Sequence, residues 1–361
     1  MLPIAINDRI LKGLLYLIVV GAILHFGQAL FIPLSFAILI SFILYPFCKW
    51  LERHKVPFVL AIFIGLVLFS FILLIILGLL IRQLVLFTQK WPQLQEKLMI
   101  SVDDLNVTLK EWGFHFMDEE KGVIGNILYY ISNDVIPRIP DALYSSSISM
   151  VLFIIIPVYV VLILIYKDLL VKFLYEVTPK SWNIHIKKIL PDVIITYYNF
   201  IKGMAIVYLI VGILNSIGLL ILGIPHAIFF GFIASILTFV PYVGITIGAL
   251  LPIAVAWLTY DSIWYPVGII IVFVVVQVLE ANVIFPVAVS NRLKINALVT
   301  LVVIIAGGIV WGAAGMILFL PFTAIIKLIA DQIPELKSLS ILLGTNDDLH
   351  KFEREEKKIG A

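Results

Sequence analysis

The stretch 226-HAIFFGFIASILTFVPYVGITIGALLPIAVAWL-258 decides the fold class, because it is apolar and carries no Asp, Glu, Lys or Arg. It is interrupted at its centre by 240-VPYVG-244. Each half holds about 13–16 residues, which as α-helix measure roughly 20–24 Å. The hydrocarbon core of a bilayer is about 30 Å thick. We therefore predict a membrane-embedded helical hairpin, whose broken backbone is covered by protein or water.

The composition of the whole chain agrees with a membrane protein. Hydrophobic residues make up 62% of 361 positions, charged residues make up 13%, and the mean hydropathy is +1.12. Soluble domains are about half apolar and about a quarter charged. The net charge of +2 and the lack of a basic stripe beside aromatic residues predict no nucleic-acid partner. The single cysteine, Cys48, excludes an internal disulfide and a cysteine-based zinc site.

Other apolar tracts are long enough to predict transmembrane helices, which need about 20 residues each. The tract 13–48 predicts two helices with a break near 31–33, and its first helix reads as a retained span rather than a cleaved signal peptide. Single spans are predicted at 58–81, at 147–166 with a kink at Pro157, at 204–222 and at 263–281.

A second interrupted tract, 297–329, has glycines at its centre. The stretch 307-GGIVWGAAG-315 contains Gly307, Gly308, Gly312 and Gly315. Glycine permits a break and also lets helices pack closely. We predict a second broken hairpin near 307–315, and the alternative for both hairpins is two ordinary spans. The fold class is thus an all-α integral membrane protein with about six full transmembrane helices plus two interrupted or re-entrant hairpins, or about eight spans by simple counting.

The two interrupted tracts share a weak likeness. Ala227 aligns with Ala297 and Pro252 with Pro321, at offsets of 70 and 69 residues. With one full span between them, the hairpins would enter the membrane from opposite sides. That is the geometry of an inverted repeat.

The positions of lysine and arginine predict the orientation. Arg9 and Arg53 flank the first two helices, and the connection 167–202 holds six lysines against three acidic residues. These segments and both termini are predicted to be cytoplasmic, in a multi-pass protein of the inner membrane. The predicted divisions are N-terminal helices at 1–81, an extracytoplasmic amphipathic segment at 82–146, a transport core at 147–335 and a charged cytoplasmic tail at 336–361.

The segment 82–146 carries an apolar stripe at alternating three- and four-residue steps, which predicts an amphipathic helix. Pro92 is a predicted bend. The stripe consists of Leu84, Phe87, Trp91, Leu94, Leu98, Val102, Leu105, Leu109 and Trp112. It would pack on the protein's own outer surface or form a coiled-coil-like contact between protomers of a homo-oligomer.

Several motifs in order resemble the autoinducer-2 exporter family. They are 166-YKD-168, 202-KG-203, 223-GIPHA-227, 239-FVPYVG-244, 280-EAN-282 with Pro286, and Gly307, Gly308, Gly312, Gly315 and Pro321. The resemblance covers nearly the whole chain and is most specific over 197–330. It implies an oligomeric, elevator-like inner-membrane exporter of small organic signals such as autoinducer-2, although some members are described as cation/proton antiporters. Met204 and Ile245 depart from the family pattern, which leaves the substrate open.

Glu280 is the leading candidate for the transport pathway. It lies near the end of an otherwise apolar helix, with Gln277 one turn earlier and Asn282 shortly after. Ionisable residues inside membrane helices usually line a cavity or find a partner, and a carboxylate there suits proton coupling. The alternative is an interfacial glutamate that reaches water or pairs with Arg292.

The break in the first hairpin supplies further candidates. Free carbonyl and amide groups at half-helix ends bind ions and polar substrates in transporters. Pro241, Tyr242 and Gly244 form the break, and Thr238 and Thr246 add hydroxyl groups beside it. The alternative is a simple tight turn. Gly307, Gly308, Gly312 and Gly315 are candidates for the pathway or for helix packing, and Asn215 and Ser216 fit hydrogen bonding between helices.

The sequence predicts no enzyme. It lacks Gly-x-Ser-x-Gly, His-Glu-x-x-His and P-loop motifs, and its six histidines form no metal-spaced pair, so we predict no catalytic residue, metal site or cofactor. The expected partners are the lipid bilayer, a small-molecule or ion substrate, and further copies of the chain. We expect export of a small polar molecule similar to autoinducer-2, driven by an ion gradient or by the substrate gradient. The alternatives are sodium/proton antiport and a non-transporting membrane scaffold, and the broken helices favour transport over the scaffold.

Overall fold

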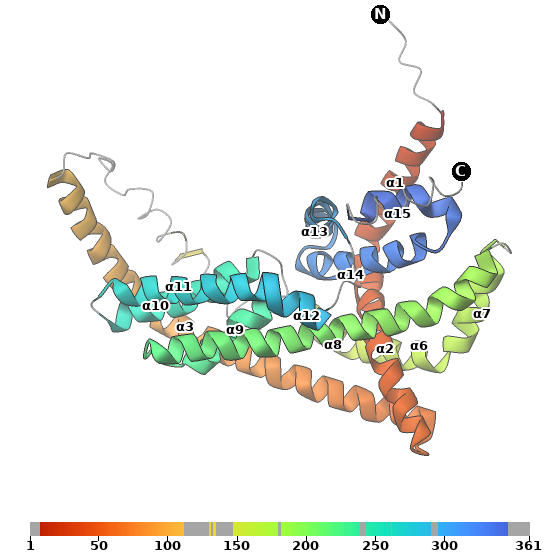
Figure 1. Cartoon of the computed structure of the whole chain (residues 1–361), viewed down its shortest axis with the longest axis horizontal. Helices are drawn as coiled ribbons and strands as arrows, with labels where there is room; N and C mark the ends of the chain where they lie inside the picture. The colour runs from red at the N-terminus through yellow and green to blue at the C-terminus, as the bar shows by residue number, and fades with distance from the viewer. Residues whose placement is uncertain are drawn as a thin grey trace, which may run out of the picture. The chain divides into compact units, whose positions relative to one another are not determined.

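The computed structural model describes residues 8–111, 130, 133–134, 147–179, 182–238, 243–260, 262–289 and 295–345. Within these residues every regular element is a helix (Figure 1). Five of the described helices are long and apolar enough to cross a membrane, and a sixth span results if one bent helix pair is counted. The predicted all-α integral membrane class is confirmed.

The helices of the N-terminal half are α1 (Asp8–Phe26), α2 (Gln28–Arg53), α3 (Phe58–Glu111), α6 (Ser147–Ile165), α7 (Lys167–Val177) and α8 (Asn183–Ile221). Those of the C-terminal half are α9 (Ala227–Leu237), α10 (Val243–Thr259), α11 (Trp264–Leu279), α12 (Phe285–Val289), α13 (Ala297–Trp311), α14 (Ala313–Ala330) and α15 (Lys337–Leu343). A π-helix, η3 (Glu280–Ile284), separates α11 from α12, and a short 3₁₀ turn, η4 (Pro334–Leu336), precedes α15.

The chain forms two compact units. The terminal unit comprises Met1–Leu66, Leu152–Gly203 and Val289–Ala361, and the central unit comprises Val67–Val151 and Met204–Ala288. The terminal unit has a core around Leu39, Tyr197, Trp311 and Leu318, which come from α2, α8, α13 and α14. The core of the central unit gathers around Leu219, Phe230, Ala256, Ile269 and Phe273, from α8 to α11. The four functional divisions proposed from the sequence stay predictions.

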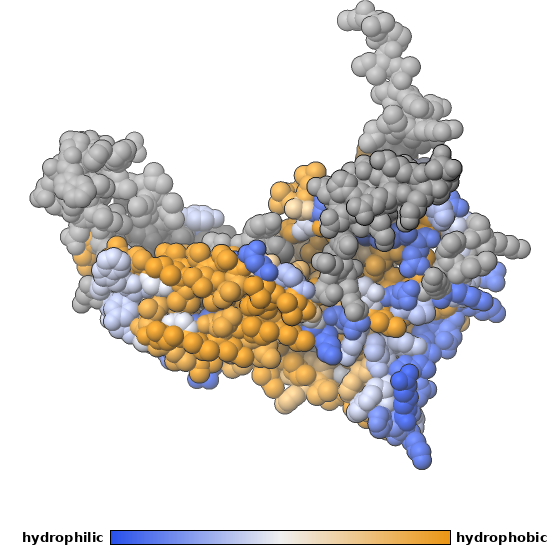
Figure 2. Space-filling model, viewed as in Figure 1, coloured by the Kyte–Doolittle hydropathy of each residue, from blue (hydrophilic) through white to orange (hydrophobic). Residues whose placement is uncertain are grey.

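The central unit presents apolar side chains outward. On α11, Ile271, Val274 and Val275 are all more than half exposed, and Figure 2 shows hydrophobic surface over α10 and α11. Exposed apolar patches of this extent mark contact with a membrane or a partner. Together with the span-length helices, they indicate a surface in contact with lipid.

The predicted break between the first two helices was misplaced. It lies at Gly27, whose carbonyl accepts hydrogen bonds from the Leu30 and Phe31 N–H groups at 2.9 Å, and not at 31–33. Pro33 is buried inside α2. Transmembrane helices tolerate an internal proline because neighbouring groups satisfy the freed backbone. Proline was therefore a poor marker of the helix end here.

The next two connections also differ from the simple pattern. Helix α6 continues through Pro157, and the chain bends by 72° between α6 and α7 at Tyr166. Much of the connection 167–202 is helical, because α7 and the first half of α8 lie in it. Helix α3 extends unbroken from the span Phe58–Leu79 to Glu111. Of its amphipathic stripe, Trp91 is buried, while the other stripe side chains lie outside the described residues.

Both interrupted tracts form helical hairpins, with breaks of different extent. In the first, α9 and α10 pack against each other, with α9 ending at Leu237 and α10 beginning at Val243. In the second, α13 and α14 pack together and are separated by Gly312 alone, which has φ 59° and ψ −140°. Gly307, Gly308 and Gly315 are helical, so the broad break predicted over 307–315 is narrowed to one residue. Helix α14 has 18 residues, enough to qualify as a span.

Candidate functional site

Glu280 directly follows α11 and lies in line with the buried face of that helix. Ile269, Phe273 and Val276 on that face are buried at helical steps, and Glu280 continues the series with 8% exposure. The opposite face carries the exposed residues Ile271, Val274, Val275 and Val278. Because these exposed residues form the apolar outer surface, the Glu280 side chain is directed into the central unit. This placement within the span Trp264–Val289 is typical of functional intramembrane carboxylates.

The backbone changes character at Glu280, which begins the π-helix Glu280–Ile284. Single π-helical turns inside α-helices occur frequently at functional sites. The Asn282 side-chain amide donates a hydrogen bond of 2.8 Å to the Val278 carbonyl. An unbroken α-helix would pair that carbonyl with the Asn282 N–H group. Asn282 therefore stabilises the π-helical turn from an exposed position, rather than joining Glu280 inside the unit.

Helix α8 brings polar groups into the interior of the same unit. Val207, Val211, Asn215 and Leu219 are buried along one face, and Asn215 is 4% exposed. The Tyr208 hydroxyl oxygen, on the same helix, is also buried. Ser216 donates hydrogen bonds to the carbonyls of Gly212, at 2.6 Å, and of Ile228, at 3.2 Å. The bond to Ile228 links α8 to α9, the helix-linking role predicted for this polar pair.

Oε2 of Glu280 and Oδ1 of Asn215 are buried in the central unit and make no hydrogen bond within the described part of the chain. Nearly all buried polar atoms in proteins have a hydrogen-bond partner, so each exception calls for an explanation. The carboxyl oxygen can take a proton or a cation, and both oxygens can accept a hydrogen bond from a substrate. Gln277 is partly buried one turn before Glu280, and Arg292, the alternative partner, lies outside the described residues.

The break of the first hairpin brings Gly244 against the end of α9. A Cβ atom at Gly244 would collide with the Leu237 carbonyl group, because the two backbones touch there. The Thr238 hydroxyl donates to the Ala234 carbonyl at 2.8 Å, so it is held by its own helix. Pro241, Tyr242 and the Thr246 side chain lie outside the described residues. The role of this break in the pathway stays a prediction.

The glycines of the second hairpin lie in the terminal unit, apart in the chain from the unit that holds Glu280. A Cβ atom at Gly307 would collide with the Gly315 backbone, and the reverse also holds. At Gly308 it would meet only the Met316 side chain, with its Cε atom at 2.7 Å. Gly307 and Gly315 thus allow α13 and α14 to touch backbone to backbone, and a contribution to the pathway stays a prediction.

Sequence reasoning missed one charged cluster. Lys327 is 3% exposed within the span-length helix α14 and forms an ion pair with Asp331. The hydroxyl group of the buried Ser340 donates to the same carboxylate oxygen and so links α15 to α14. The signal was present, since Lys327 and Asp331 stand four residues apart at the end of an apolar tract, the spacing of a helical ion pair.

Known proteins resemble this chain over most of its length. The family described as AI-2E family transporter matches residues 14–335. The Bacillus subtilis (strain 168) protein named "Putative transport protein YrrI" is 29% identical over 315 residues, which cover 83% of this chain and 85% of the relative. The Escherichia coli (strain K12) protein named "AI-2 transport protein TqsA" is 24% identical over 353 residues, covering 95% of this chain and 96% of the relative.

Proposed function

The chain belongs to the AI-2E transporter family and is a multi-pass membrane transporter, and from this premise we propose that it exports a small polar organic molecule in exchange for protons, with Glu280 as the proton-carrying group. The family assignment gives the class of protein. The cargo, the direction and the driving force are the proposal.

The cargo is proposed to be similar to autoinducer-2. The support comes from the relative named AI-2 transport protein, which aligns with 95% of this chain. The buried polar groups of the central unit, the Tyr208 hydroxyl, Asn215 and Glu280, suit a small molecule rich in oxygen, because they offer hydrogen-bond donors and acceptors in an apolar surrounding.

The observation that carries proton coupling is the buried Glu280 carboxyl group. Its Oε2 atom lacks a hydrogen bond within the described residues, and it stands at a π-helical turn inside a span. An ionised carboxylate in such a place is costly unless it is paired, and proton relays of transporters use such carboxyl groups. A purely structural scaffold would gain nothing from this arrangement.

Sodium/proton antiport is the second candidate, because the same carboxyl group could exchange a proton for a sodium ion. Carboxylate oxygens bind hard cations such as Na⁺, and intramembrane carboxyl groups mark ion pathways. The two functions differ in what moves: antiport requires a sodium gradient and no organic cargo.

The experiment uses purified protein in proteoliposomes. Wild-type protein should accumulate labelled autoinducer-2 when a pH gradient is imposed, without a requirement for sodium. Glu280→Gln keeps the shape of the side chain but cannot release a proton. This variant should lose gradient-driven accumulation and its pH dependence, while slow downhill movement of the labelled molecule continues.

The matched control is Glu176→Gln, which removes the same charge from an exposed position on α7. It should transport like wild type. Unchanged accumulation in Glu280→Gln would refute the coupling role. Sodium-driven proton movement in liposomes that contain no organic cargo would favour antiport. A wild-type protein that moves neither solute nor ions under any gradient would favour the scaffold.

A further inference from the structure

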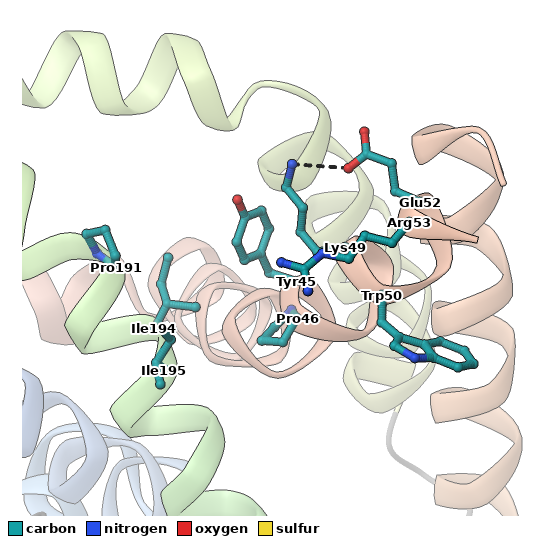
Figure 3. A pocket seen from close by; sticks show the side chains of 9 residues that line it. All are labelled: Tyr45, Pro46, Lys49, Trp50, Glu52, Arg53, Pro191, Ile194 and Ile195. Atoms are coloured by element: carbon teal, nitrogen blue, oxygen red, sulfur yellow. Dashed lines mark ion pairs between the residues drawn. The ribbon is translucent and has the colours of Figure 1, made fainter. Parts of the chain in front are cut away.

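A cavity of about 680 Å³ opens in the terminal unit beside the end of α2 (Figure 3). One wall comes from the last turns of α2, with Tyr45, Lys49 and Arg53 among its residues, and the other comes from α8, with Pro191, Ile194 and Ile195. The α2 wall carries aromatic side chains, two basic residues and the acidic Glu52, whereas the α8 wall is apolar. The cavity therefore has one polar side and one hydrophobic side, a lining that matches an amphiphilic ligand.

The charges at this cavity leave one cation uncompensated. Lys49 pairs with Glu52 at 3.1 Å. Lys167, which does not line the cavity, pairs with Asp168 at 3.0 Å. Arg53 has no ion-pair partner in the part of the chain that the structure describes. Figure 3 shows its guanidinium group extended toward Tyr45 and Pro46, on the side of α2 that faces Ile194.

The position along the helix fits the membrane surface. Arg53 is the last residue of the span Gln28–Arg53, and Tyr45 and Trp50 lie in its final turns. Tyrosine and tryptophan are enriched where the hydrocarbon meets the headgroups, and basic side chains at this level attract anionic lipids. A guanidinium group can hold a phosphate through two parallel hydrogen bonds.

We propose that this cavity binds the phosphodiester headgroup of an anionic membrane phospholipid, with Arg53 on the phosphate, Lys49 beside it and an acyl chain against Ile194 and Ile195. Both walls of the cavity are needed for this assignment. A free anion would use Arg53 and Lys49 but would gain nothing from the apolar wall on α8. The site is independent of the proposed transport mechanism, because none of its residues takes part in the Glu280 site.

Native mass spectrometry of the purified full-length protein tests the proposal by titration with phosphatidylglycerol or with phosphatidylcholine. Wild-type protein should retain phosphatidylglycerol in preference. Arg53→Gln should weaken its retention at least about fivefold, since one basic residue near an anionic surface contributes about that factor. Lipid retention by Arg53→Lys should lie between that of wild-type protein and that of Arg53→Gln, because an ammonium group keeps the charge but loses the paired hydrogen bonds.

The control variant is Lys172→Gln, which removes a basic charge from an exposed position on α7 outside the cavity. It should retain the lipid like wild type. Ile194→Trp is a second probe that fills the apolar side and leaves both cations in place, and it should also weaken retention. Thermal unfolding of each variant verifies that it is folded before lipid is added.

Two results would overturn the proposal. One is equal retention of phosphatidylglycerol by wild-type protein, Arg53→Gln and Ile194→Trp. The other is displacement of the lipid by millimolar inorganic phosphate, together with lipid retention that is insensitive to Ile194→Trp. That second result would make the cavity a site for a free anion.

Discussion

The indole Nε1–H group of Trp311 donates a hydrogen bond of 2.8 Å to the backbone carbonyl of Leu24, a residue 287 positions earlier in the chain. A second bond of 3.2 Å joins the His25 ring to the Val310 carbonyl. Both carbonyls belong to the last turn of a helix, α1 or α13, where carbonyls lack partners within the helix. The first helix and the second hairpin thus each donate a hydrogen bond to a carbonyl group at the other's helix end.

Trp311→Phe should destabilise the terminal unit. The change removes the donor to Leu24 and leaves a ring able to pack edge-to-face on Phe319, now 5.1 Å away between ring centres. We expect the free energy of unfolding to fall by about 1 kcal/mol. Thermal or denaturant unfolding in detergent measures it. Trp264→Phe is the matched control, because Trp264 is 74% exposed, and equal losses in both variants would contradict the role of the bond.

Gly315→Ala should lower the free energy of unfolding more than Gly308→Ala does, although both changes add one methyl group. The added methyl group at Gly315 collides with the Gly307 backbone, which cannot move without separating α13 from α14. Overpacking of this kind costs about 1–3 kcal/mol. At Gly308 the methyl group meets only the end of the flexible Met316 side chain, which can turn away. Unfolding of the two variants side by side provides the test, and a larger loss at Gly308 would contradict the backbone contact.

Lys327 and Asp331 should prove energetically coupled. Lys327→Met removes a buried charge, and Asp331→Asn removes the carboxylate that pairs with it and accepts from Ser340. A double-mutant cycle isolates the pair, and residues in direct contact typically show coupling of about 0.5–3 kcal/mol. We expect the double variant to be more stable than the sum of the single losses implies. Additive losses would show that the pair contributes nothing beyond its separate side chains.

Much of the fold could be predicted because apolar tract length is a direct consequence of bilayer thickness. The spans Phe58–Leu79 and Trp264–Val289 follow from it, whereas the span predicted at 204–222 begins earlier, at Ile189. Helix ends were less predictable. Pro33 and Pro157 lie inside helices, and the observed turns fall at Gly27 and Tyr166, because a proline in a membrane helix can be accommodated by its neighbours.

The candidate site was predictable only in part. Glu280 stood out as a charge in an apolar helix, and the structure places it directly after α11, in line with the buried face of that helix. Its π-helical turn depends on local backbone hydrogen bonds, which no residue pattern in the sequence predicts. Tyr208 was missed because a tyrosine among apolar residues has no distinctive spacing, and only the packing of α8 buries its hydroxyl group.

The orientation in the membrane remains a prediction, and the chain suits a test by cysteine labelling. Its one cysteine, Cys48, is fully buried, so introduced cysteines should dominate the reaction with an impermeant thiol reagent. Ile100 is 55% exposed on the extension of α3, and Phe173 is 63% exposed on α7. The distribution of lysine and arginine predicts that 82–146 lies outside and 167–202 inside. In intact cells, Ile100→Cys should therefore react at once.

Phe173→Cys should react only after the membrane is permeabilised, and unmodified protein gives the background of Cys48. Both introduced side chains are exposed in the structure, so a difference between them reports the side of the membrane rather than burial within the protein. Labelling of Phe173→Cys in intact cells, with Ile100→Cys protected, would reverse the orientation. It would also place the end of α2, with Arg53, on the outer face.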